Sequence, residues 1–553
     1  MQPTQPSPTD VIEIEWQFDA PSLAGVRRWL RSEPALDGCV IVPLGGHLQR
    51  DTYFDSPDWR VYRANYTLRV RRQRRAAEVT LKAFGVASRG PRARREITES
   101  LPLGSSDPLR GEGLVREPLT ALLGTQHLTP LFEVVTRRES YALERDGVRL
   151  AAVDLDRTRV SAPARTAEAA PPDPDEGGAT VLAAPVPALN RIEIELTKAG
   201  DASDVEAVVR TFAEACNLGP AVLSKFQAGL LALELSPPPA DAPRPPRALR
   251  RMPLHEFALA AVRHDFSQLL RHEPGTRLGL DDEALHQMRV ATHRSQTALG
   301  LFEPTLPGAQ SLRNDLAWVG DALGRVRDLD VELGALGDYA TGLEVPGSLG
   351  PVADILRSER TAARTALIAA LDSDRYAKCV SRVTAMLAST SADLTDASSE
   401  GETPRESTPS TPEFAAELLR QRFQRLRRDA SRLDAGSPPA EFHALRTRVK
   451  RFRYAVDFFS PLTRKASGRM AAAAQRVQDL LGEHQDADVA IDRFVAWARD
   501  EERALPVDTV IAIGQIVERN RVRMRQLRRR FPRTFRRMRA AWLPLRRAVE
   551  RRG

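Results

Sequence analysis

The sequence predicts an α+β protein in which an N-terminal domain of β-strands, resembling a barrel, is followed by an all-α domain. Three observations support this prediction. Short segments before residue 235 alternate apolar and polar residues, the pattern after residue 252 is helical, and a Pro-rich segment separates the two regions. The chain has 553 residues, which is too long for a single hydrophobic core, so at least two domains are expected.

The N-terminal domain is expected at residues 10–235. Its clearest strand patterns, which have a period of two residues, are Val11–Phe18, Thr67–Arg71, Glu78–Lys82 and Arg191–Leu196. Helices are expected at residues 22–32 and 204–215. Residues 161–188 are rich in Ala, Pro, Asp and Gly, a composition that predicts a mobile loop.

The helical domain is expected at residues 252–545, after a semi-rigid Pro-rich linker at 236–251. A second, polar linker at residues 389–412 divides the helical region into halves at 252–388 and 413–545. This division predicts two helical bundles in succession.

The two helical halves repeat each other. Residues 286–289 (His-Gln-Met-Arg) match residues 443–446 (His-Ala-Leu-Arg) at an offset of 157. Residues 323–331 match residues 481–489 at an offset of 158. Two matched blocks in the same order at nearly one offset predict a duplicated helical bundle.

The positive charge is concentrated at the C-terminal end. Residues up to Pro412 include 48 basic and 56 acidic side chains, whereas Glu413 to Gly553 include 33 basic and 17 acidic ones. A basic region of this size favours a polyanionic partner, which could be nucleic acid, an anionic membrane or polyphosphate.

The sequence favours a reducing compartment and no membrane insertion. Its three cysteines, Cys39, Cys216 and Cys379, are far apart and form no disulfide or zinc pattern. We see no signal peptide, and no stretch of about 18 apolar residues without charge. We therefore expect a cytoplasmic protein. Its oligomeric state is not indicated by the sequence.

The strand domain places carboxylates in pairs. Glu13 and Glu15 lie two residues apart and share one strand face, as do Glu193 and Glu195. Carboxylates gathered on one face repel one another unless a cation lies among them, and Mg²⁺ prefers such oxygen ligands. Basic residues also share faces, as in Arg69 with Arg71, Arg92 with Arg94, and Lys82 on the next strand. The combination suits a metal-bound oligophosphate.

This domain resembles the CYTH family, the triphosphate tunnel metalloenzymes. Glu13-Ile-Glu-Trp-Gln17 stands where that family has Glu-x-Glu-x-Lys. The further matches, in the family's order, are Tyr53-Phe-Asp-Ser56, Leu68-Arg-Val-Arg71, Leu81-Lys82, Arg94-Arg-Glu96, Val153-Asp154, Ile192-Glu-Ile-Glu195 and Ser224-Lys225. The resemblance implies an eight-stranded antiparallel tunnel that binds a triphosphate and Mg²⁺ or Mn²⁺. Members of the family hydrolyse tripolyphosphate or thiamine triphosphate, or make cyclic AMP.

The resemblance also implies roles for individual residues. The implied metal or water-positioning ligands are Glu13, Glu15, Asp154, Glu193 and Glu195. The implied phosphate-binding residues are Arg69, Arg71, Lys82, Arg94, Arg137 and Lys225. The resemblance implies that position 17 is catalytic together with Glu13 and Glu15. Two positions depart from the family pattern. Gln17 replaces the motif lysine, and Val135 stands where a basic residue often precedes Thr-Arg. Fewer cations weaken both phosphate binding and transition-state stabilisation.

In the helical domain, cations follow one face of a helix. His443, Arg446, Lys450 and Arg453 are spaced i, i+3, i+7 and i+10, which predicts a single stripe. The duplicate stripe contains His286, Arg289 and His293, with Arg294 beside it. A row of like charges is unfavourable unless an anion or an acidic partner lies against it.

This half resembles the CHAD family, the conserved histidine α-helical domains. The matches lie at residues 286–290, 324–330, 442–454 and 480–488. The resemblance implies two four-helix bundles with a basic groove that binds inorganic polyphosphate. The implied polyphosphate-binding residues are His286, Arg289, His293, Arg294, Arg325, Arg327, His443, Arg446, Lys450, Arg451 and Arg453. His293 and Gln296 replace commonly basic positions, so weaker binding is expected in the first half.

Taken together, the sequence predicts a polyphosphate-binding protein whose tunnel binds and hydrolyses short phosphate chains with Mg²⁺ or Mn²⁺. One alternative is a non-catalytic scaffold of polyphosphate granules with a degenerate tunnel. A nucleic-acid-binding protein is less favoured, because the sequence has no helix-turn-helix, zinc or aromatic stacking signature.

Overall fold

The computed structural model describes most of the chain. The described residues are 8–32, 35–73, 76–84, 90–102, 104–111, 113–163, 189–237, 252–341, 343, 345, 347–388, 410–500 and 503–551. Most of the predicted loop at 161–188 and of the linkers at 236–251 and 389–412 therefore lies outside the described residues. The chain divides into two compact units, Met1–Ala240 with Glu273–Asp281, and Asp241–His272 with Asp282–Gly553. Each unit is described by itself.

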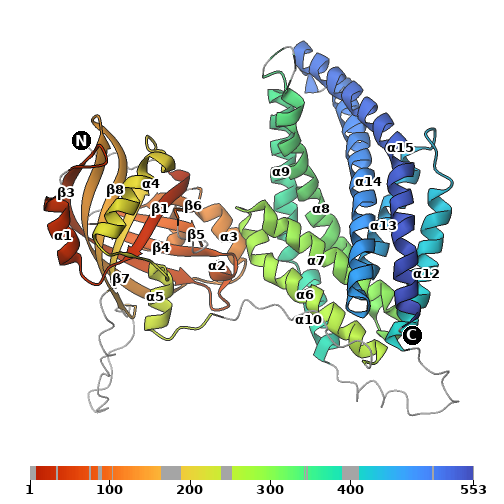
Figure 1. The fold of residues 1–553 in the computed structure, drawn as a ribbon, viewed down its shortest axis with the longest axis horizontal. Helices are drawn as coiled ribbons and strands as arrows, with labels where there is room; N and C mark the ends of the chain where they lie inside the picture. Colours follow the sequence, from red (N-terminus) through yellow and green to blue (C-terminus); the bar gives the residue numbers. More distant parts are fainter. Residues whose placement is uncertain are drawn as a thin grey trace. The chain divides into compact units, whose positions relative to one another are not determined.

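The first unit is a closed antiparallel barrel of eight strands (Figure 1). In order around the barrel, the strands are β1 (Thr9–Asp19), β6 (Arg92–Leu101), β5 (Ala76–Ala83), β4 (Tyr66–Gln73), β3 (Cys39–Asp55), β7 (Thr129–Arg145), β8 (Val148–Ser161) and β9 (Leu189–Leu196). Strand β9 pairs with β1 and closes the barrel. Two short strands extend it, since β2 (Ala35–Leu36) pairs with β3 and β10 (Gly219–Pro220) pairs with β1. The predicted eight-stranded tunnel is confirmed.

Short helices cover the barrel. They are α1 (Leu23–Ser32), α2 (Arg60–Arg63), α3 (Arg116–Leu123), α4 (Ala202–Ala215) and α5 (Lys225–Ala232), with a 3-10 turn at Pro108–Arg110. The sequence predicts α1 and α4 but not α3 or α5.

Alternation along β1 separates the outer core from the tunnel. Trp16 packs outward in a hydrophobic cluster with Val26 of α1 and Phe212 of α4. Because successive side chains on a strand point to opposite faces, Glu15 and Gln17 point into the barrel.

The second unit is helical. Its first half contains α6 (Leu254–Leu278), of which the residues from Glu273 on belong to the first unit, together with α7 (Asp282–Leu301), α8 (Ala309–Ala340), α9 (Gly350–Leu371) and α10 (Asp374–Ala388). Its second half contains α12 (Thr411–Ala430), α13 (Pro439–Phe458), α14 (Arg464–Arg499) and α15 (Val507–Glu550). Single 3-10 turns lie at Glu303–Thr305 and Ser460–Leu462. None of the described helices is long and apolar enough to cross a membrane.

The helix boundaries confirm the duplication. Helices α12, α13 and α15 each begin 157 residues after α6, α7 and α9, and α14 begins 155 residues after α8. The single helix α15 occupies the positions of both α9 and α10, which are separated by Asp372 and Ser373. Each half therefore has four helical positions, and the last is interrupted only in the first half.

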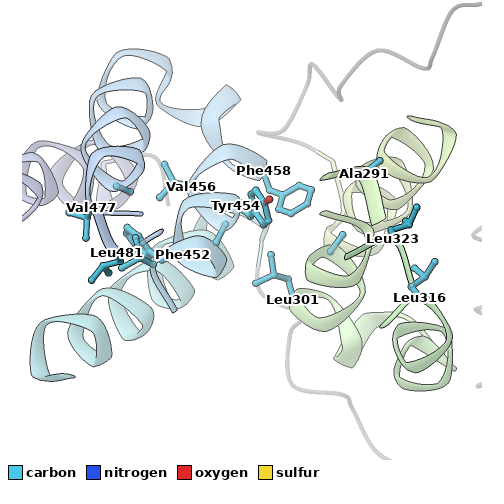
Figure 2. Close-up of a cluster of buried hydrophobic side chains, with 14 of the residues drawn as sticks. Ala291, Leu301, Leu316, Leu323, Phe452, Tyr454, Val456, Phe458, Val477 and Leu481 are labelled. Atoms are coloured by element: carbon cyan, nitrogen blue, oxygen red, sulfur yellow. The ribbon is translucent and has the colours of Figure 1, made fainter. Parts of the chain in front are cut away.

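The two helical halves share one hydrophobic core. Leu301 of α7 and Tyr454 and Phe458 of α13 belong to the same buried cluster, and Figure 2 shows the two α13 rings directed toward α7. Helices α7 and α13 contact each other. This packing brings the two predicted basic stripes together.

Candidate functional site

The tunnel interior is lined by charged side chains of both signs. Strands β1, β6 and β9 place Glu13, Glu15, Arg94, Glu193 and Glu195 on inward faces, and their registers pair Glu13 with Arg94 and Glu15 with Glu195. Glu15 and Arg94 are buried and the other three are half-buried, and burial makes each unpaired charge costly. Cations and carboxylates therefore neutralise one another inside the barrel.

One wall of the tunnel is organised around Lys82 and Arg94. The Lys82 ammonium contacts Glu13 and lies 2.9 Å from Glu96 Oε2 and 3.8 Å from Glu15 Oε1. Arg94 is paired with Glu15. These contacts hold two predicted phosphate-binding cations against two predicted metal ligands.

A second group of contacts surrounds Asp51 of β3. Arg71 binds Asp51 through two hydrogen bonds, with Nε to Oδ1 at 2.8 Å and the second guanidinium nitrogen to Oδ2 at 2.9 Å. Arg69 lies 3.7 Å from Asp51 Oδ2 and 3.6 Å from Glu96 Oε1. The charges of Arg71 and Arg69 outweigh the effect of burial and lower the pKa of Asp51.

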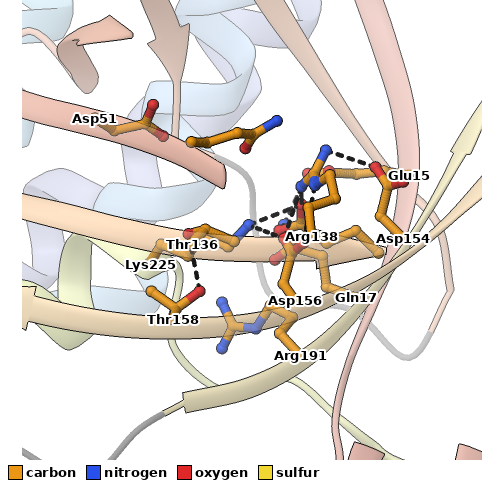
Figure 3. A network of polar contacts seen from close by, with 12 residues as sticks. Glu15, Gln17, Asp51, Thr136, Arg138, Asp154, Asp156, Thr158, Arg191 and Lys225 are labelled. Atoms are coloured by element: carbon orange, nitrogen blue, oxygen red, sulfur yellow. Dashed lines mark hydrogen bonds and ion pairs between the residues drawn. The ribbon is translucent and has the colours of Figure 1, made fainter. Parts of the chain in front are cut away.

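Arg138 of β7 is the centre of a third group (Figure 3). Its guanidinium donates to Asp156 at 2.8 and 2.7 Å and to Glu193 at 2.7 Å, and lies 2.5 Å from Asp154. Lys225 reaches the same carboxylates, at 2.5 Å from Asp156 and 3.0 Å from Glu193. Two cations thus share three carboxylates.

Lys225 is placed by the start of α5. Ser224 caps this helix by accepting from the backbone N–H of Gln227, and the Gln227 side chain accepts in return from the Ser224 N–H. Such a reciprocal cap fixes the first turn of a helix. Lys225 is therefore held at a defined position, with its amine inside the tunnel.

Gln17 occupies a junction between carboxylates and a further arginine. Its amide nitrogen donates to Glu15 at 3.1 Å and to Glu193 at 3.3 Å, while its amide oxygen accepts from Arg92 at 3.0 Å. Arg92 also donates to the carbonyl of Ala221. A lysine at position 17 could donate to Glu15 and Glu193, but it could not accept the hydrogen bond from Arg92. Arg92 therefore supplies a positive charge beside Gln17, which is itself uncharged.

The carboxylates of the tunnel differ in their proton affinity. Burial and the neighbouring charge of Glu13 raise the pKa of Glu195 to about 7. Burial acts on Glu193 too, but Lys225 and Arg138 hold its pKa well below the usual value. The same opposition lowers the pKa of Glu96 to about 2, because Lys82 and Arg69 outweigh its burial. Glu195 is thus the carboxylate least satisfied by cations.

The carboxylates fit a hard divalent cation in their chemistry. Asp154 and Glu195 line an open cavity of about 540 Å³ together with Arg138, Ser140 and His47. Glu195 lies close enough to Glu13 for the two charges to oppose each other, which is a repulsion that a divalent cation would relieve. Among the described residues, however, no group of three or more His, Cys, Asp or Glu side chains is arranged so that it could hold a metal ion.

The strand register places two predicted positions outside the tunnel. Arg137 is exposed and pairs with Leu48 and Arg157, which are also exposed. Val135 lies on the same outer face, because it is two residues from Arg137. Arg138, rather than Arg137, is the inward cation of β7, and the lack of charge at Val135 removes nothing from the tunnel. The inward residue beside it is Thr136, which hydrogen-bonds Thr158.

Sequence reasoning also missed several inward residues, namely Asp51, Glu96, Arg138 and Asp156, whereas it placed Arg92 on one face with Arg94. Their spacing held a signal, since Asp154 and Asp156 lie two residues apart on one strand, as do Arg92 and Arg94. Which of the two alternating sets faces inward depends on how the strands pair, and the sequence of a single strand does not determine its pairing.

In the helical unit, the two stripes meet where α7 contacts α13. Arg289 and Arg446 occupy equivalent positions, and each lies over a glycine of the neighbouring helix. A Cβ atom added at Gly324 would lie 3.8 Å from Arg289 Nε, and one added at Gly482 would lie 3.5 Å from Arg446 Nε. In the described structure, both Nε atoms are buried without a hydrogen-bond partner. The repeated Leu-Gly motif therefore makes room for an arginine in each half.

The meeting point is strongly cationic. Burial, together with the charges of Arg289 and Arg446, lowers the pKa of Lys450 to about 7. Burial and the same group of cations lower the pKa of His293 to about 3. Four basic positions, at 289, 293, 446 and 450, thus lie close together. The carboxylates on which the two arginines act are Asp328 and Asp486.

The other predicted groove residues fall into three groups. Arg294 is tied into the fold, 2.8 Å from buried Asp265 and over the ring of Phe458. Arg453 donates to Gln478 and Asp457 and stacks on Tyr454. The exposed or half-buried positions are His286, Arg325, Arg327, His443 and Arg451. Asp328 lies 3.8 Å from Arg289, and Asp330 lies 2.5 Å from Arg360, so both face arginines.

The chain thus combines a closed barrel lined by paired charges with a duplicated helical domain in which basic side chains of α7 and α13 lie close together. The chain contains a CYTH domain, matched over residues 44–229, and a CHAD domain, matched over residues 260–495.

Solved structures resemble parts of the chain. The CHAD domain from the plant Ricinus communis is 26% identical, covers 52% of this chain and 93% of its own, and gives a TM-score of 0.43. PptA from Streptomyces chartreusis is 20% identical, with coverages of 52% and 100% and a TM-score of 0.41. A protein from Hippeastrum, described as an adenylyl cyclase with a dominant triphosphatase activity, is 17% identical, with coverages of 39% and 94% and a TM-score of 0.28. No curated protein matches the chain.

Proposed function

We propose that the tunnel binds and hydrolyses inorganic triphosphate or similarly short phosphate chains, and that the helical domain binds long polyphosphate. The observation that carries the proposal is the set of cations enclosed by the barrel, which are Arg69, Arg71, Lys82, Arg94, Arg138 and Lys225. CYTH domains bind triphosphate substrates in general.

The chemistry proposed is metal-assisted attack of water on a phosphoryl group. Mg²⁺ or Mn²⁺ would be held by carboxylates drawn from Glu13, Glu15, Asp154, Glu193 and Glu195, and would supply charge neutralisation and activation of water. The cations of the chain would position the phosphates in line and stabilise the charge that moves during transfer. Asp154 and Glu195 are favoured as ligands, because they line the open cavity.

Binding requires an exchange of partners inside the tunnel. Each proposed phosphate-binding cation is already paired with a carboxylate. A phosphate chain must therefore replace Asp51 as the partner of Arg71, or replace Asp156 and Glu193 as the partners of Lys225. A divalent cation would neutralise the carboxylates released in this way. We therefore propose that metal and phosphate bind together.

The test is phosphate release from tripolyphosphate, thiamine triphosphate and ATP, with and without Mg²⁺ or Mn²⁺. Glu195→Gln should abolish release, because it removes a carboxylate from the open cavity without changing side-chain size. Tripolyphosphate binding that requires metal but yields no phosphate would favour the non-catalytic alternative, a scaffold at cytoplasmic polyphosphate granules.

The helical domain needs its own test. Changing Arg446 and Lys450 to Ala should weaken polyphosphate binding much more than changing Arg529 and Arg530 to Ala, although each variant loses two basic residues. The first pair lies at the meeting point of α7 and α13, and the second lies on exposed parts of α15. Equal losses would mean that the domain acts as a diffuse basic surface.

A further inference from the structure

The two helical halves carry opposite charges at one pair of equivalent positions. The repeat offset of 157 aligns Asp265 of α6 with Arg422 of α12, and Arg294 of α7 with Arg451 of α13. In the first half, Arg294 Nε lies 2.8 Å from Oδ1 of Asp265, whose side chain is only 1% exposed. In the second half, an arginine takes the place of the aspartate, so two guanidinium groups replace a neutral pair.

The surroundings of Arg422 agree with this alignment. Arg422 is half-buried, and its pKa is lowered to about 10 by burial and by the charges of Arg451 and then Arg425. Arg425 and Arg451 are exposed, so the cluster is open to solvent. In the part of the chain that the structure describes, these three arginines make no ion pair with a carboxylate.

Such a cluster is unfavourable on its own. Like charges one helical turn apart repel each other, and a half-buried guanidinium without an acceptor loses hydration. If the side chain of residue 422 served only to cover the apolar residues beside it, an uncharged side chain would cover them at lower cost. An anion bound at this cluster would offset both penalties.

The cluster continues the groove. Arg451 directly follows Lys450 on α13, and its charge also acts on Arg422 of α12, so the cluster adjoins the basic residues where α7 meets α13. At the equivalent place in the first half, Asp265 neutralises Arg294, and Asp457 lies 3.9 Å from the same arginine. Among the described residues, the three arginines are therefore left without carboxylate partners in the second half, whereas Arg294 is neutralised in the first half.

We propose that Arg422, Arg425 and Arg451 form an anion-binding extension of the groove, so that a long polyphosphate chain leaves it over α12 rather than over α6. The inference rests on the proposed binding of polyphosphate by the helical domain. The ligand it implies is a linear chain of phosphoryl groups long enough to contact the groove and the extension at once.

The experiment compares two charge-matched variants of the full-length protein. Arg422→Asp rebuilds the neutral pair of the first half, and Arg427→Asp makes the same charge change at an exposed position of the same helix. We expect Arg422→Asp to weaken binding of long-chain polyphosphate about tenfold, and to reduce the slope of log affinity against log salt by about 1 to 2. Arg427→Asp should change both quantities much less.

The outcomes separate the two proposals. If the wild type does not bind long-chain polyphosphate, the proposed function itself fails. If the wild type binds but both variants bind equally well, or lose equal affinity, only the extension is refuted. Arg422→Gln guards against misfolding, since it adds no charge and should give an intermediate loss with an unchanged circular dichroism spectrum.

Discussion

At the scale of single residues, adjacent arginines of β7 have opposite environments. Arg138 contacts Asp154, Asp156 and Glu193, whereas Arg137 is exposed. Arg138→Gln should lower the free energy of unfolding by about 3–5 kcal/mol, because it leaves buried carboxylates with one cation fewer. Arg137→Gln should stay within about 0.5 kcal/mol of the wild type. Urea unfolding of both variants measures this, and a similar loss in each would contradict the assigned register.

Gln17 offers a second residue-scale prediction. We expect weak metal-dependent tripolyphosphatase activity in the wild type, and Gln17→Lys should raise it, because a lysine adds charge where negative charge shifts during phosphoryl transfer. A well-placed donor contributes about 3 kcal/mol, or roughly a hundredfold in rate. Arg92 limits the gain, since it donates to the Gln17 oxygen that a lysine lacks.

The double variant Gln17→Lys with Arg92→Gln should therefore be faster than Gln17→Lys alone. Phosphate release at saturating Mg²⁺ and at saturating Mn²⁺ measures both gains. If the wild type and both variants bind tripolyphosphate with metal but release no phosphate, the tunnel is a binding module and the enzyme proposal is wrong.

Residue patterns predicted which side chains matter better than they predicted which way those side chains point. The alternation of Glu13, Glu15 and Gln17 was sufficient to place all three on one face of β1. In β7, Thr136 and Arg138 share one face and Arg137 lies on the other. Because both faces carry polar or charged residues, the local pattern does not show which face points inward. The choice is made by pairing with β8, where Arg138 lies opposite Asp156. Tertiary register thus decided what local sequence could not.

At the scale of elements, the contact between α7 and α13 makes binding at the groove sensitive to pH. Lys450 has a pKa of about 7 in the folded protein, below its ordinary value of 10.5. A bound polyanion favours the charged amine, so binding at pH 8 should take up a proton. Calorimetry in two buffers of different ionisation enthalpy measures the uptake.

Three variants make this prediction specific. Lys450→Met should abolish the proton uptake at pH 8. Arg446→Met should reduce the uptake, because it removes one of the charges that lower the pKa of Lys450. Arg529→Met, at an exposed position of α15, should leave the uptake unchanged. The lowered pKa also means that the unfolded chain binds a proton between about pH 7 and 10.5 that the folded protein does not. Stability should therefore rise with pH across this window in the wild type, and the contribution should be missing in Lys450→Met.

The helical elements were more predictable than the small helices of the barrel. The repeated motifs at 286–289 and 443–446 fixed the offset that α7 and α13 then showed. The eight residues of α3 and of α5 are too short to show a clear helical period, and both are formed by packing against the barrel. Similarly, the sequence did not separate α9 from α10, because only two residues divide them.

At the scale of the whole molecule, the two domains should bind phosphate chains in different ways. The groove has few carboxylates, so polyphosphate should bind the full-length protein without metal, and affinity should fall steeply with salt as counterions are released. Duplex DNA of equal charge should compete poorly, because its phosphates are held on a wide and rigid helix. Fluorescence anisotropy in a salt titration tests this, and equally strong binding of both polymers would contradict the polyphosphate proposal.

The neutralised interior of the barrel has a consequence for turnover. An incoming triphosphate carries enough charge to displace several internal carboxylates at once. If the tunnel hydrolyses it as proposed, the orthophosphate and the pyrophosphate produced each carry less charge. Once the chain is cut, Asp51, Asp156 and Glu193 can return to the arginines and to Lys225, and so compete with the products for the same cations. The carboxylates that neutralise the cations of the tunnel would thereby help to release the products after each cycle, and they would exclude small anions such as sulfate or orthophosphate.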